Sequence, residues 1–453
     1  MTTLETEWKE NPRWNGVVRA YTPKEVVNLR GTFNIEYTLA KRGSEKFWNL
    51  LHTESHLLAL GALTGNQAKE QVRGGLKAIY GSGWQIAADA NVLGQTLPDL
   101  SLYPHNSGPK LVEALNNALH RQDQIEFLEG KGGKTDWQVP IVLDMEAGFG
   151  GPKQLFVATM EAIKAGASAI HIEDQGDKKC GHMGGKCLVS TGKVIERFQA
   201  ARLAADIAGV PLVIIGRTDA EQAKFLETTG APEPADQGRV LGTTPDGKKM
   251  TYAEACAQGV AGQWRDKGVE GTWTPKLHSS RHGVKLYQIK PGLEAAVQRA
   301  LLYAPHVELL WKEADKIDLE EDRKFAEAIH VKYPGKLLSY NLSPSLNWGV
   351  IDAATREGYH KALAQMGYKF QFVTLAGFHT LNLSMFELAS DFKDRGMAAY
   401  YDHVQKPEFD APTKGYTAVK HQREAGTGYF DKVEEAIGAG TGALAGSTEE
   451  AQF

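Results

Sequence analysis

A cysteine surrounded by positive charge is the residue of this chain best suited to chemistry. Within the stretch Lys178–Lys186, Cys180 stands between two lysines and His182. Nearby positive charge favours the thiolate and so lowers the pKa of a thiol. Three glycines in the same stretch allow backbone N–H groups to turn towards an anion. The stretch predicts an ionisable thiol beside an anion-binding loop; the alternative is an exposed basic loop with an unreactive cysteine.

Carboxylates form a second group of residues that could take part in chemistry. Asp144, Glu146 and Glu173 each follow a short apolar run, and Asp99 lies upstream of them. Mg²⁺ prefers oxygen ligands, usually one or two carboxylates together with water and substrate. Strand-end acids can instead cap the next helix. Both interpretations remain open for Asp144, and capping is the one we favour for Asp174.

Several polar residues near predicted strands could hold a carboxylate. The serine hydroxyl and glycine amides of Ser82-Gly83-Trp84 could bind one, although this tripeptide could equally be a tight turn. Arg217 ends an apolar run, where a guanidinium can bind a carboxylate through two hydrogen bonds, unless it only pairs with Asp219. Neutral donors that could either bind an anion or cap a helix follow two further runs: Asn341, Ser343, Ser345 and Thr374.

The elements that must position these residues alternate along the chain. Most apolar runs are continuous, which is typical of strands buried on both faces. We predict strands at 84–88, 139–143, 169–172, 211–215, 307–311, 337–340 and 370–375, and helices at 45–63, 151–165, 191–208 and 319–333. Strand followed by helix indicates parallel βα units, in a barrel or a doubly wound sheet. Both place the active site at the carboxyl ends of the strands.

The regular alternation covers only part of the chain. Residues 1–60 are predicted to be a helical segment and 61–390 the catalytic α/β domain. A surface insertion at about 232–290 is rich in turns and charges, with a possible helix at 252–267. Residues 391–453 are predicted to return to helix and end in a glycine-rich tail. His171, inside an apolar run, is interpreted as a hydrogen-bonded core histidine.

Composition narrows the class of protein. The chain has 453 residues, of which 42% are hydrophobic, and a net charge of −4. This balance argues against a nucleic-acid-binding or membrane protein. Three cysteines without zinc-like spacing indicate a reducing compartment. With no signal sequence, no run long enough to span a bilayer and no peroxisomal C-terminus, a cytoplasmic protein is expected.

The motifs together resemble one enzyme family. Lys178-Lys179-Cys180-Gly181-His182-Met183 is similar to the signature hexapeptide of the isocitrate lyase family. Other segments resemble that family in the same order, from near residue 10 to the C-terminus. They are Ser82-Gly83-Trp84, Asp99, Asp144-x-Glu146, His171-Ile-Glu173-Asp174-Gln175, Arg217-Thr-Asp219-Ala, Asn341-x-Ser343-Pro344-Ser345 and Thr374-Leu-Ala-Gly.

The resemblance implies a fold, an assembly and a reaction. It implies a modified (β/α)8 barrel of the TIM type, a helix exchanged between subunits, and a homotetramer. It also implies Mg²⁺-dependent cleavage of isocitrate into glyoxylate and succinate in the glyoxylate bypass, with Mn²⁺ as a substitute metal. Neither nucleic acid nor membrane is an expected partner.

The resemblance also implies roles for individual residues. Asp144 would anchor the metal, with Asp99, Glu146 and Glu173 around it through water. Cys180 would carry a proton to the succinate carbanion, with His182 and Glu173 beside the reacting atoms. Glyoxylate would be held by Ser82, Gly83 and Trp84. The substrate carboxylates would be held by Gly181, His182, Arg217, Asn341, Ser343, Pro344, Ser345 and Thr374.

Three positions depart from the family pattern. Lys312 and Ala314 stand where an uncharged residue and a threonine are common, and Leu346 replaces a usual phenylalanine. These departures leave the reaction class intact and bear on substrate preference and subunit packing. A 2-methylisocitrate lyase is the nearest alternative, and a non-catalytic dicarboxylate-binding relative is another.

Overall fold

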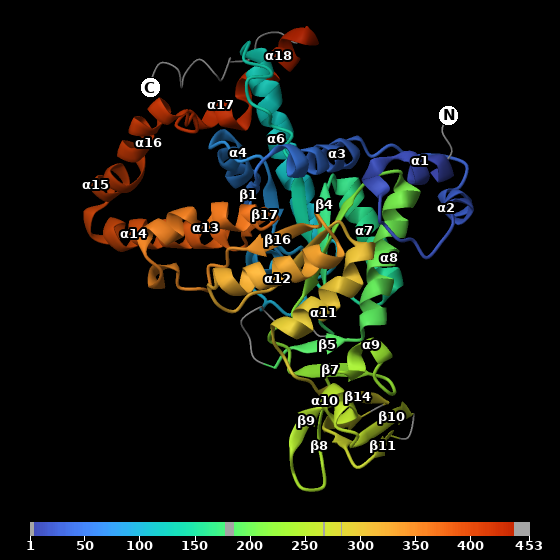
Figure 1. Cartoon of the computed structure of the whole chain (residues 1–453). Helices are drawn as coiled ribbons and strands as arrows, with labels where there is room; N and C mark the ends of the chain where they lie inside the picture. Colours follow the sequence, from blue (N-terminus) through green and yellow to red (C-terminus); the bar gives the residue numbers. More distant parts are fainter. Residues whose placement is uncertain (1–3, 177–184, 266–267, 282, 439–453) are drawn as a thin grey trace.

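Eight parallel strands form a nearly closed barrel at the centre of the molecule (Figure 1). A computed structural model describes residues 4–176, 185–265, 268–281 and 283–438. The barrel strands are β1 (Leu57–Leu60), β2 (Ile79–Gly81), β3 (Ile141–Asp144), β4 (Ala169–Glu173), β6 (Val213–Thr218), β15 (Leu309–Lys312), β16 (Leu337–Asn341) and β17 (Tyr368–Val373). Their order is β1-β17-β16-β15-β6-β4-β3-β2, and a parallel bridge between Gly61 and Tyr80 joins the ends. The predicted α/β barrel is confirmed.

Alternate strand residues fill the interior of the barrel. Side chains point to opposite faces at successive positions of a strand. One set forms a single buried cluster: Leu57, Ala59, Tyr80, Val142, Ala169, Val213, Ile215, Leu309, Trp311, Phe370 and Phe372. Phe47 and Leu51 of helix α3 (Thr38–Thr53) belong to the same cluster and are fully buried. Helix α3 therefore closes the amino end of the barrel.

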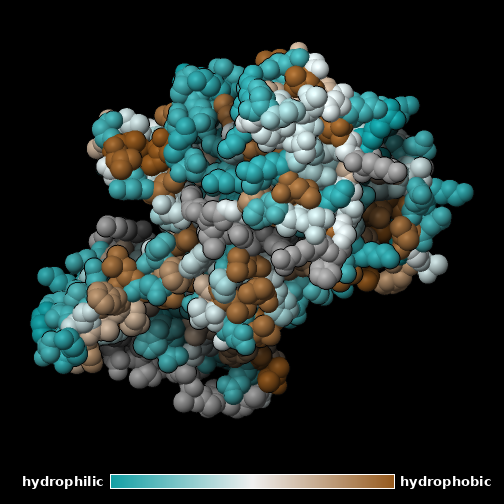
Figure 2. Space-filling model, turned by 90° about the horizontal axis from the view of Figure 1, so that it is seen from below, coloured by the Kyte–Doolittle hydropathy of each residue, from teal (hydrophilic) through white to brown (hydrophobic). Residues whose placement is uncertain are grey.

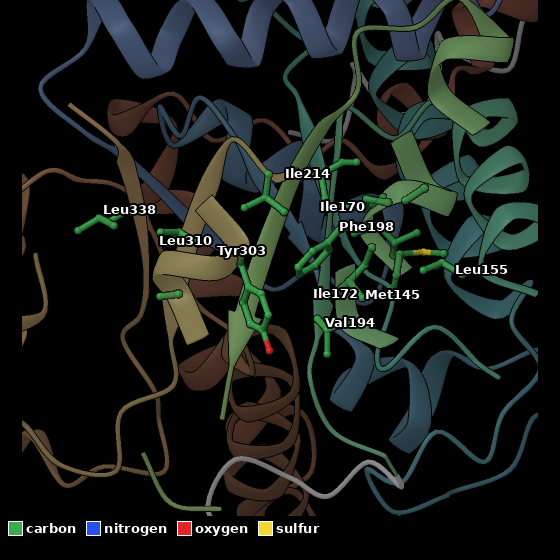
Figure 3. Packing of buried hydrophobic residues seen from close by; sticks show 14 of the residues in the cluster. Met145, Leu155, Ile170, Ile172, Val194, Phe198, Ile214, Tyr303, Leu310 and Leu338 are labelled. Carbon is green, nitrogen blue, oxygen red and sulfur yellow. The ribbon is translucent and has the colours of Figure 1, made fainter. Parts of the chain in front are cut away.

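The other face of the strands packs against a ring of helices. In Figure 3, Ile170 and Ile214 of neighbouring strands lie beside Phe198, with Tyr303 close to it. The labelled residues belong to one apolar cluster, and burial of its side chains stabilises the barrel. The helices are α4 (Gly65–Arg73), α6 (Ser107–Leu128), α7 (Pro152–Ala165), α8 (Thr191–Ala208), α11 (Leu293–Tyr303), α12 (Leu319–Lys332) and α13 (Ala353–Gln365).

Three predicted elements are wrong. The predicted strand 84–88 is helical, as α5 (Gly83–Gln85) and the π-helix η2 (Ile86–Ala90), because the Ser82 side chain caps the turn by accepting the Gln85 N–H. The predicted helix 45–63 ends at Thr53, and β1 follows it. The predicted helix 252–267 is only α10 (Tyr252–Ala257), followed by β10 (Ala261–Arg265). Short apolar runs do not distinguish a strand from a helical segment.

A small β-rich unit, formed by β5 and by the chain between β6 and α11, lies at the carboxyl end of the barrel, opposite α3 (Figure 1). One of its sheets has the order β13-β14-β7-β5. The Trp264 ring contacts the rings of Trp273 and Tyr287 inside the unit. Its elements are β5 (Cys187–Val189), β7 (Phe225–Thr228), α9 (Pro234–Gln237), β8 (Leu241–Thr243), β9 (Lys249–Thr251), α10, β10, β11 (Gly268–Gly271), β12 (Thr274–Pro275), β13 (Leu277–Arg281) and β14 (Val284–Gln288).

Helical segments precede and follow the barrel. The first contains α1 (Leu4–Glu10), η1 (Pro12–Trp14) and α2 (Pro23–Arg30), and Thr22 caps α2. Short 3-10 turns η3 (Ala304–His306) and η4 (Trp348–Val350) precede β15 and α13. The last segment contains α14 (Ala376–Arg395), α15 (Met397–Tyr400), η5 (Tyr401–Gln405), α16 (Lys406–Asp410), η6 (Ala411–Lys414), α17 (His421–Ala425) and α18 (Thr427–Ala436).

The C-terminal helices leave the barrel and then return. Helices α14 to α16 project to one side of the barrel, and α17 and α18 come back to α6 (Figure 1). On the face seen from below, hydrophobic side chains form separate patches among hydrophilic ones (Figure 2). No helix of the described chain combines the length and apolarity needed to cross a bilayer.

Candidate active site

The alternation that fills the barrel also brings polar residues to its carboxyl end. Asp144, Arg217 and Glu313 each lie two positions beyond an inward-facing residue of the core, and Glu173 and Asn341 end their strands. All five are buried, at 9% exposure or less. A two-residue period places them on the inner face of neighbouring strands. The barrel therefore gathers charged side chains at one end of its interior.

Asp144, at the end of β3, lies on the first strand of this set. Its Oδ2 atom accepts the Gly83 backbone N–H at 3.1 Å, and its Oδ1 atom accepts the Glu146 N–H at 2.8 Å. The Nε2 atom of His171 lies 3.0 Å from the same Oδ1. The Tyr80 hydroxyl is 2.7 Å from His171 Nε2, as expected for a hydrogen-bonded core histidine. These contacts orient the Asp144 carboxylate.

Glu146 has a backbone conformation that non-glycine residues seldom adopt. Its φ angle is 55°, in the left-handed region. The Tyr103 hydroxyl donates to the Glu146 carboxylate, and the Glu146 carbonyl accepts the Glu173 N–H at 3.0 Å. Such a conformation persists only where the surrounding contacts fix it. Here they hold the Glu146 carboxylate, which is fully buried, next to the end of β4.

Glu173 and Asp99 complete the acidic residues predicted to surround a metal. Glu173 Oε1 accepts a hydrogen bond from Gln175 at 3.2 Å, and its Oε2 lies 3.4 Å from Arg217 Nε. Asp99 is 9% exposed, in the segment between η2 and α6. No three His, Cys, Asp or Glu side chains of the described residues converge into a ready metal site. Mg²⁺ commonly takes one or two carboxylates and several waters, so this donor set suits it.

Arg217 provides the positive charge of the site. Its Nε and Nη2 atoms donate to Asp219 at 2.9 and 3.0 Å, and its guanidinium lies 4.5 Å from the centroid of the Trp311 ring. Burial opposes the charge, but Asp219, Glu313 and Glu173 raise the pKa of Arg217 well above its usual value. Arg217 therefore stays charged inside the barrel.

The Asp219 carboxylate also binds a second buried cation. Lys186, 1% exposed, forms an ion pair with Asp219. Burial alone would raise the pKa of Asp219, but Arg217 and Lys186 lower it below its usual range. The predicted ion pair of Arg217 with Asp219 exists, and binding of a substrate carboxylate by Arg217 stays a prediction.

The predicted neutral donors lie around the same end. Asn341 Nδ2 donates to Glu313 Oε1 at 3.3 Å, and Ser343 Oγ accepts the Ser345 N–H at 3.2 Å. Ser343 is buried, Pro344 and Thr374 are half-buried, and Ser345 is exposed. Asn347 and Asp352, rather than these residues, cap the helices that follow.

The tripeptide Ser82-Gly83-Trp84 connects β2 to the site. Ser82 and Gly83 are buried, and Gly83 donates to Asp144 as described above. The half-buried Trp84 ring lies 4.7 Å from the Phe378 ring, centroid to centroid. The segment therefore joins the end of β2 to the first turn of α14, beside the acidic residues.

Some residues of the site were missed by the sequence analysis, and one was misinterpreted. Glu313 contacts Asn341 and lies 3.9 Å from Arg217 Nη1. Its alternation with Trp311 was the signal that could have identified it. Asp174 is not a helix cap, because its carboxylate accepts the Thr218 hydroxyl, the Asp219 N–H, Arg299 and the Tyr303 hydroxyl. Arg299 is 125 residues from Asp174 in sequence, so the local pattern gave no sign of this partner.

The predictions for the cysteine loop are not tested by the structure. Cys180, Gly181 and His182 lie outside the described residues. The description resumes with Gly185, followed by the buried Lys186. The roles predicted for Cys180, Gly181 and His182 therefore stay predictions.

Gly83→Ala is expected to lower kcat/KM by about 100-fold, because small displacements of catalytic groups have effects of that size. A Cβ atom at Gly83 would lie 2.5 Å from Glu146 Oε1 and 2.6 Å from Asp144 Oδ2, so both carboxylates must move. Steady-state kinetics measures this effect. Gly358→Ala on α13, where a Cβ meets nothing within 4 Å, is the control. Wild-type kinetics in Gly83→Ala would contradict the close packing of this glycine on the site.

Comparison with known proteins identifies related chains. The isocitrate lyase family model matches residues 3–282 and 272–453. An isocitrate lyase of Halalkalibacterium halodurans is 50% identical over 457 residues, covering 99% of this chain and 97% of the relative. An isocitrate lyase of Escherichia coli is 46% identical over 465 residues, covering 99% and 98%. A crystal structure of 2,3-dimethylmalate lyase shares the fold, with a TM-score of 0.55, 21% identity, and coverage of 91% and 98%.

Proposed function

The chain belongs to the isocitrate lyase family, and on this premise we propose that it cleaves isocitrate into glyoxylate and succinate. One structural observation supports the proposal most directly. Buried Arg217 lies beside the buried acids Glu173 and Glu313 at the carboxyl end of the barrel. A site with fixed cations and several acids suits a polyanionic substrate that binds together with a divalent cation.

Mg²⁺ is the metal that these residues fit best, with Mn²⁺ as a substitute. The donors are carboxylate oxygens, which hard divalent cations prefer. Asp144 would hold the ion directly, and Asp99, Glu146 and Glu173 would hold its waters. When bound, the ion would polarise the C2 hydroxyl and carboxylate of isocitrate. Gly83 and Glu146 donate to Asp144 through their backbone, which fixes the direction of its carboxylate.

The other residues divide between the two halves of the substrate. Ser82, Gly83 and Trp84 would hold the glyoxylate half by hydroxyl and amide groups. Arg217, Asn341, Ser343, Ser345 and Thr374 would hold the carboxylates of the succinate half, together with Gly181 and His182. Charge develops on the succinate carboxylate as the C2–C3 bond breaks, and fixed donors stabilise that charge without reorganising.

A proton must finally reach the succinate carbon. When the C2–C3 bond breaks, its electron pair remains on the succinate half and the hydroxyl loses a proton. We propose that the Cys180 thiol protonates this carbon, acting as a general acid. In the reverse direction its thiolate would remove the same proton.

The direct experiment is glyoxylate release from purified protein given isocitrate, with and without Mg²⁺. 2-Methylisocitrate is the competing substrate. Metal-dependent glyoxylate from isocitrate, with little pyruvate from the methylated acid, supports the proposal. Preference for the methylated acid would identify a 2-methylisocitrate lyase instead. Succinate binding without turnover of either acid would identify a non-catalytic relative.

Helix α14 supports a further part of the proposal, a homotetramer that exchanges a helix between subunits. Only Gly377 of α14 is buried, while Leu383, Met385 and Phe386 are 59%, 59% and 70% exposed. Large apolar side chains exposed along one helix usually mark an interaction surface. We propose that α14 packs on a second copy of the chain.

Phe386→Asp is therefore expected to shift the protein from tetramer to smaller species, because a buried carboxylate would disfavour the contact. Light scattering after size exclusion measures the change. Val331→Asp, at an isolated apolar residue of α12 that is 85% exposed, is the control. A monomeric wild type, or an unchanged tetramer in Phe386→Asp, would contradict the proposed exchange.

A further inference from the structure

Lys312 is a buried cation surrounded by three carboxylates. Its Nζ atom lies 2.5 Å from Glu221 Oε2, 3.2 Å from Glu321 Oε1 and 3.6 Å from Asp322 Oδ1. The Lys312 side chain is 2% exposed. Removing the buried cation from such a group leaves buried charge without compensation. Lysines usually lie on the surface, but Lys312 is part of the folded interior.

The position of Lys312 places it directly behind the active site. Trp311 points into the barrel core, so the two-residue period turns Lys312 outwards and Glu313 inwards. The inward neighbour, Glu313, contacts Asn341 and approaches Arg217. The outward Lys312 joins three separate parts of the chain: the end of β15, the first turn of α12 and the segment 219–224.

Burial shifts the pKa values of this group. Burial is the main cause that raises the pKa of Glu221 to about 8 and that of Asp322 to about 6. Burial opposes the charge of Lys312, but Glu221 and Asp322 raise its pKa. The Tyr359 hydroxyl also donates to Asp322 at 3.3 Å. Lys312 thus stays charged, and Glu221 remains its nearest partner.

The segment 219–224 binds the two buried cations of the active site. Asp219 begins it and binds Arg217 and Lys186 through its carboxylate. Its carbonyl accepts the Ala223 N–H at 3.1 Å, which closes the segment into a turn. The Lys224 N–H donates to the Lys186 carbonyl at 3.2 Å. Glu221 lies inside this turn, and Lys312 ties it to α12.

We propose that Lys312 is a positioning residue for substrate binding. Through Glu221 it fixes the segment 219–224, and through that segment it sets the orientation of Asp219 and Arg217. Arg217 is the residue that binds a substrate carboxylate, so this inference rests on the proposed function. Lys312 itself does not touch the substrate; it acts through the chain Glu221, Asp219 and Arg217.

The test is Lys312→Met, which keeps the length of the side chain and removes the charge. The KM for isocitrate and the Kd for succinate are both expected to rise about tenfold, with a smaller change in kcat. Isothermal titration with succinate and Mg²⁺ measures binding without turnover. Thermal unfolding is measured in parallel, because a purely structural lysine would lower Tm and leave the KM of the folded protein unchanged.

A double-mutant cycle separates the proposed chain of contacts from a general effect. Glu221→Leu should raise KM and Kd similarly, and Lys312→Met with Glu221→Leu should be no worse than either single variant. Lys316→Met is the matched control, since Lys316 binds Glu321 at 2.8 Å from an exposed position and does not contact Glu221. It should keep the wild-type KM.

Two results would overturn the inference. One is an unchanged KM and succinate Kd in folded Lys312→Met, and the other is additivity of the two substitutions in the cycle. If Lys312→Met fails to fold, a wild-type succinate Kd in Glu221→Leu overturns it equally. The unchanged chain is assayed first: absence of glyoxylate release contradicts the proposed function, and the succinate comparison still decides the role of Lys312.

Discussion

Asp144→Asn is expected to raise the Mg²⁺ concentration for half-maximal glyoxylate release by about 100-fold or more. Changes to residues that merely support a metal ligand already cost 10- to 100-fold in metal affinity, and Asp144 is the proposed direct ligand. An amide also disturbs its surroundings, because the two oxygens of Asp144 each accept a backbone N–H, from Gly83 and Glu146. The NH₂ group of asparagine must face one of these donors. Mg²⁺ titration of the initial rate measures the effect.

The control for this prediction is an acid outside the site. Asp136 pairs with Lys46 and its side chain is 69% exposed, so Asp136→Asn should keep the wild-type titration. Leaving a buried donor unsatisfied costs about 1–3 kcal/mol, so Asp144→Asn should also lower the free energy of unfolding. Saturating Mg²⁺ should restore part of the rate. An unchanged Mg²⁺ titration in a folded Asp144→Asn protein would place the metal elsewhere.

Cys180→Ser is expected to reduce kcat by about 10²–10⁴-fold, the usual contribution of a general acid or base. A serine hydroxyl is a far weaker acid than a thiol and would not deliver a proton to the succinate carbon at neutral pH. Substrate binding should change little, since sulfur and oxygen differ little in size. Single-turnover measurements of glyoxylate formation and succinate release separate the two steps.

The other two cysteines provide the controls. Cys187 is half-buried in β5 and Cys256 is exposed in α10. Cys187→Ser and Cys256→Ser should both retain the wild-type kcat. If Cys180→Ser retains more than about a tenth of wild-type kcat, the proton comes from another group.

The length of the apolar runs decided which strands could be predicted. Those of β3, β4, β6 and β15 to β17 are mainly apolar and lead into polar residues, and the structure has strands there. Strand β2 has only the three residues Ile79–Gly81. The longer apolar run at 84–88 predicts a strand, but the Ser82 cap makes it helical. Strand β1 was hidden by the apolar face of α3, which continues into it. Local composition does not record such caps and tertiary contacts.

The candidate site was predictable to a different degree for each kind of residue. Carboxylates and Arg217 follow predicted strands, so their presence at one end of the barrel followed from the fold class. Lys312 could not be placed in this way, because its partner Glu221 is 91 residues away and only burial makes their pairing important. The contacts of Asp174 with Arg299 and Tyr303 span more than 120 residues, for the same reason. Pairing over such distances is a property of the folded chain.

The closed amino end of the barrel has a kinetic consequence. Within the described residues, Phe47 and Leu51 fill the interior below the site. Substrate and products must therefore pass between the site and solvent through the carboxyl end. One substrate enters there and two products leave there. The product bound deeper has no path of its own while the shallower one occupies the opening. Product release is therefore expected to follow a fixed order, and the last product to leave competes with the next substrate molecule for the free enzyme.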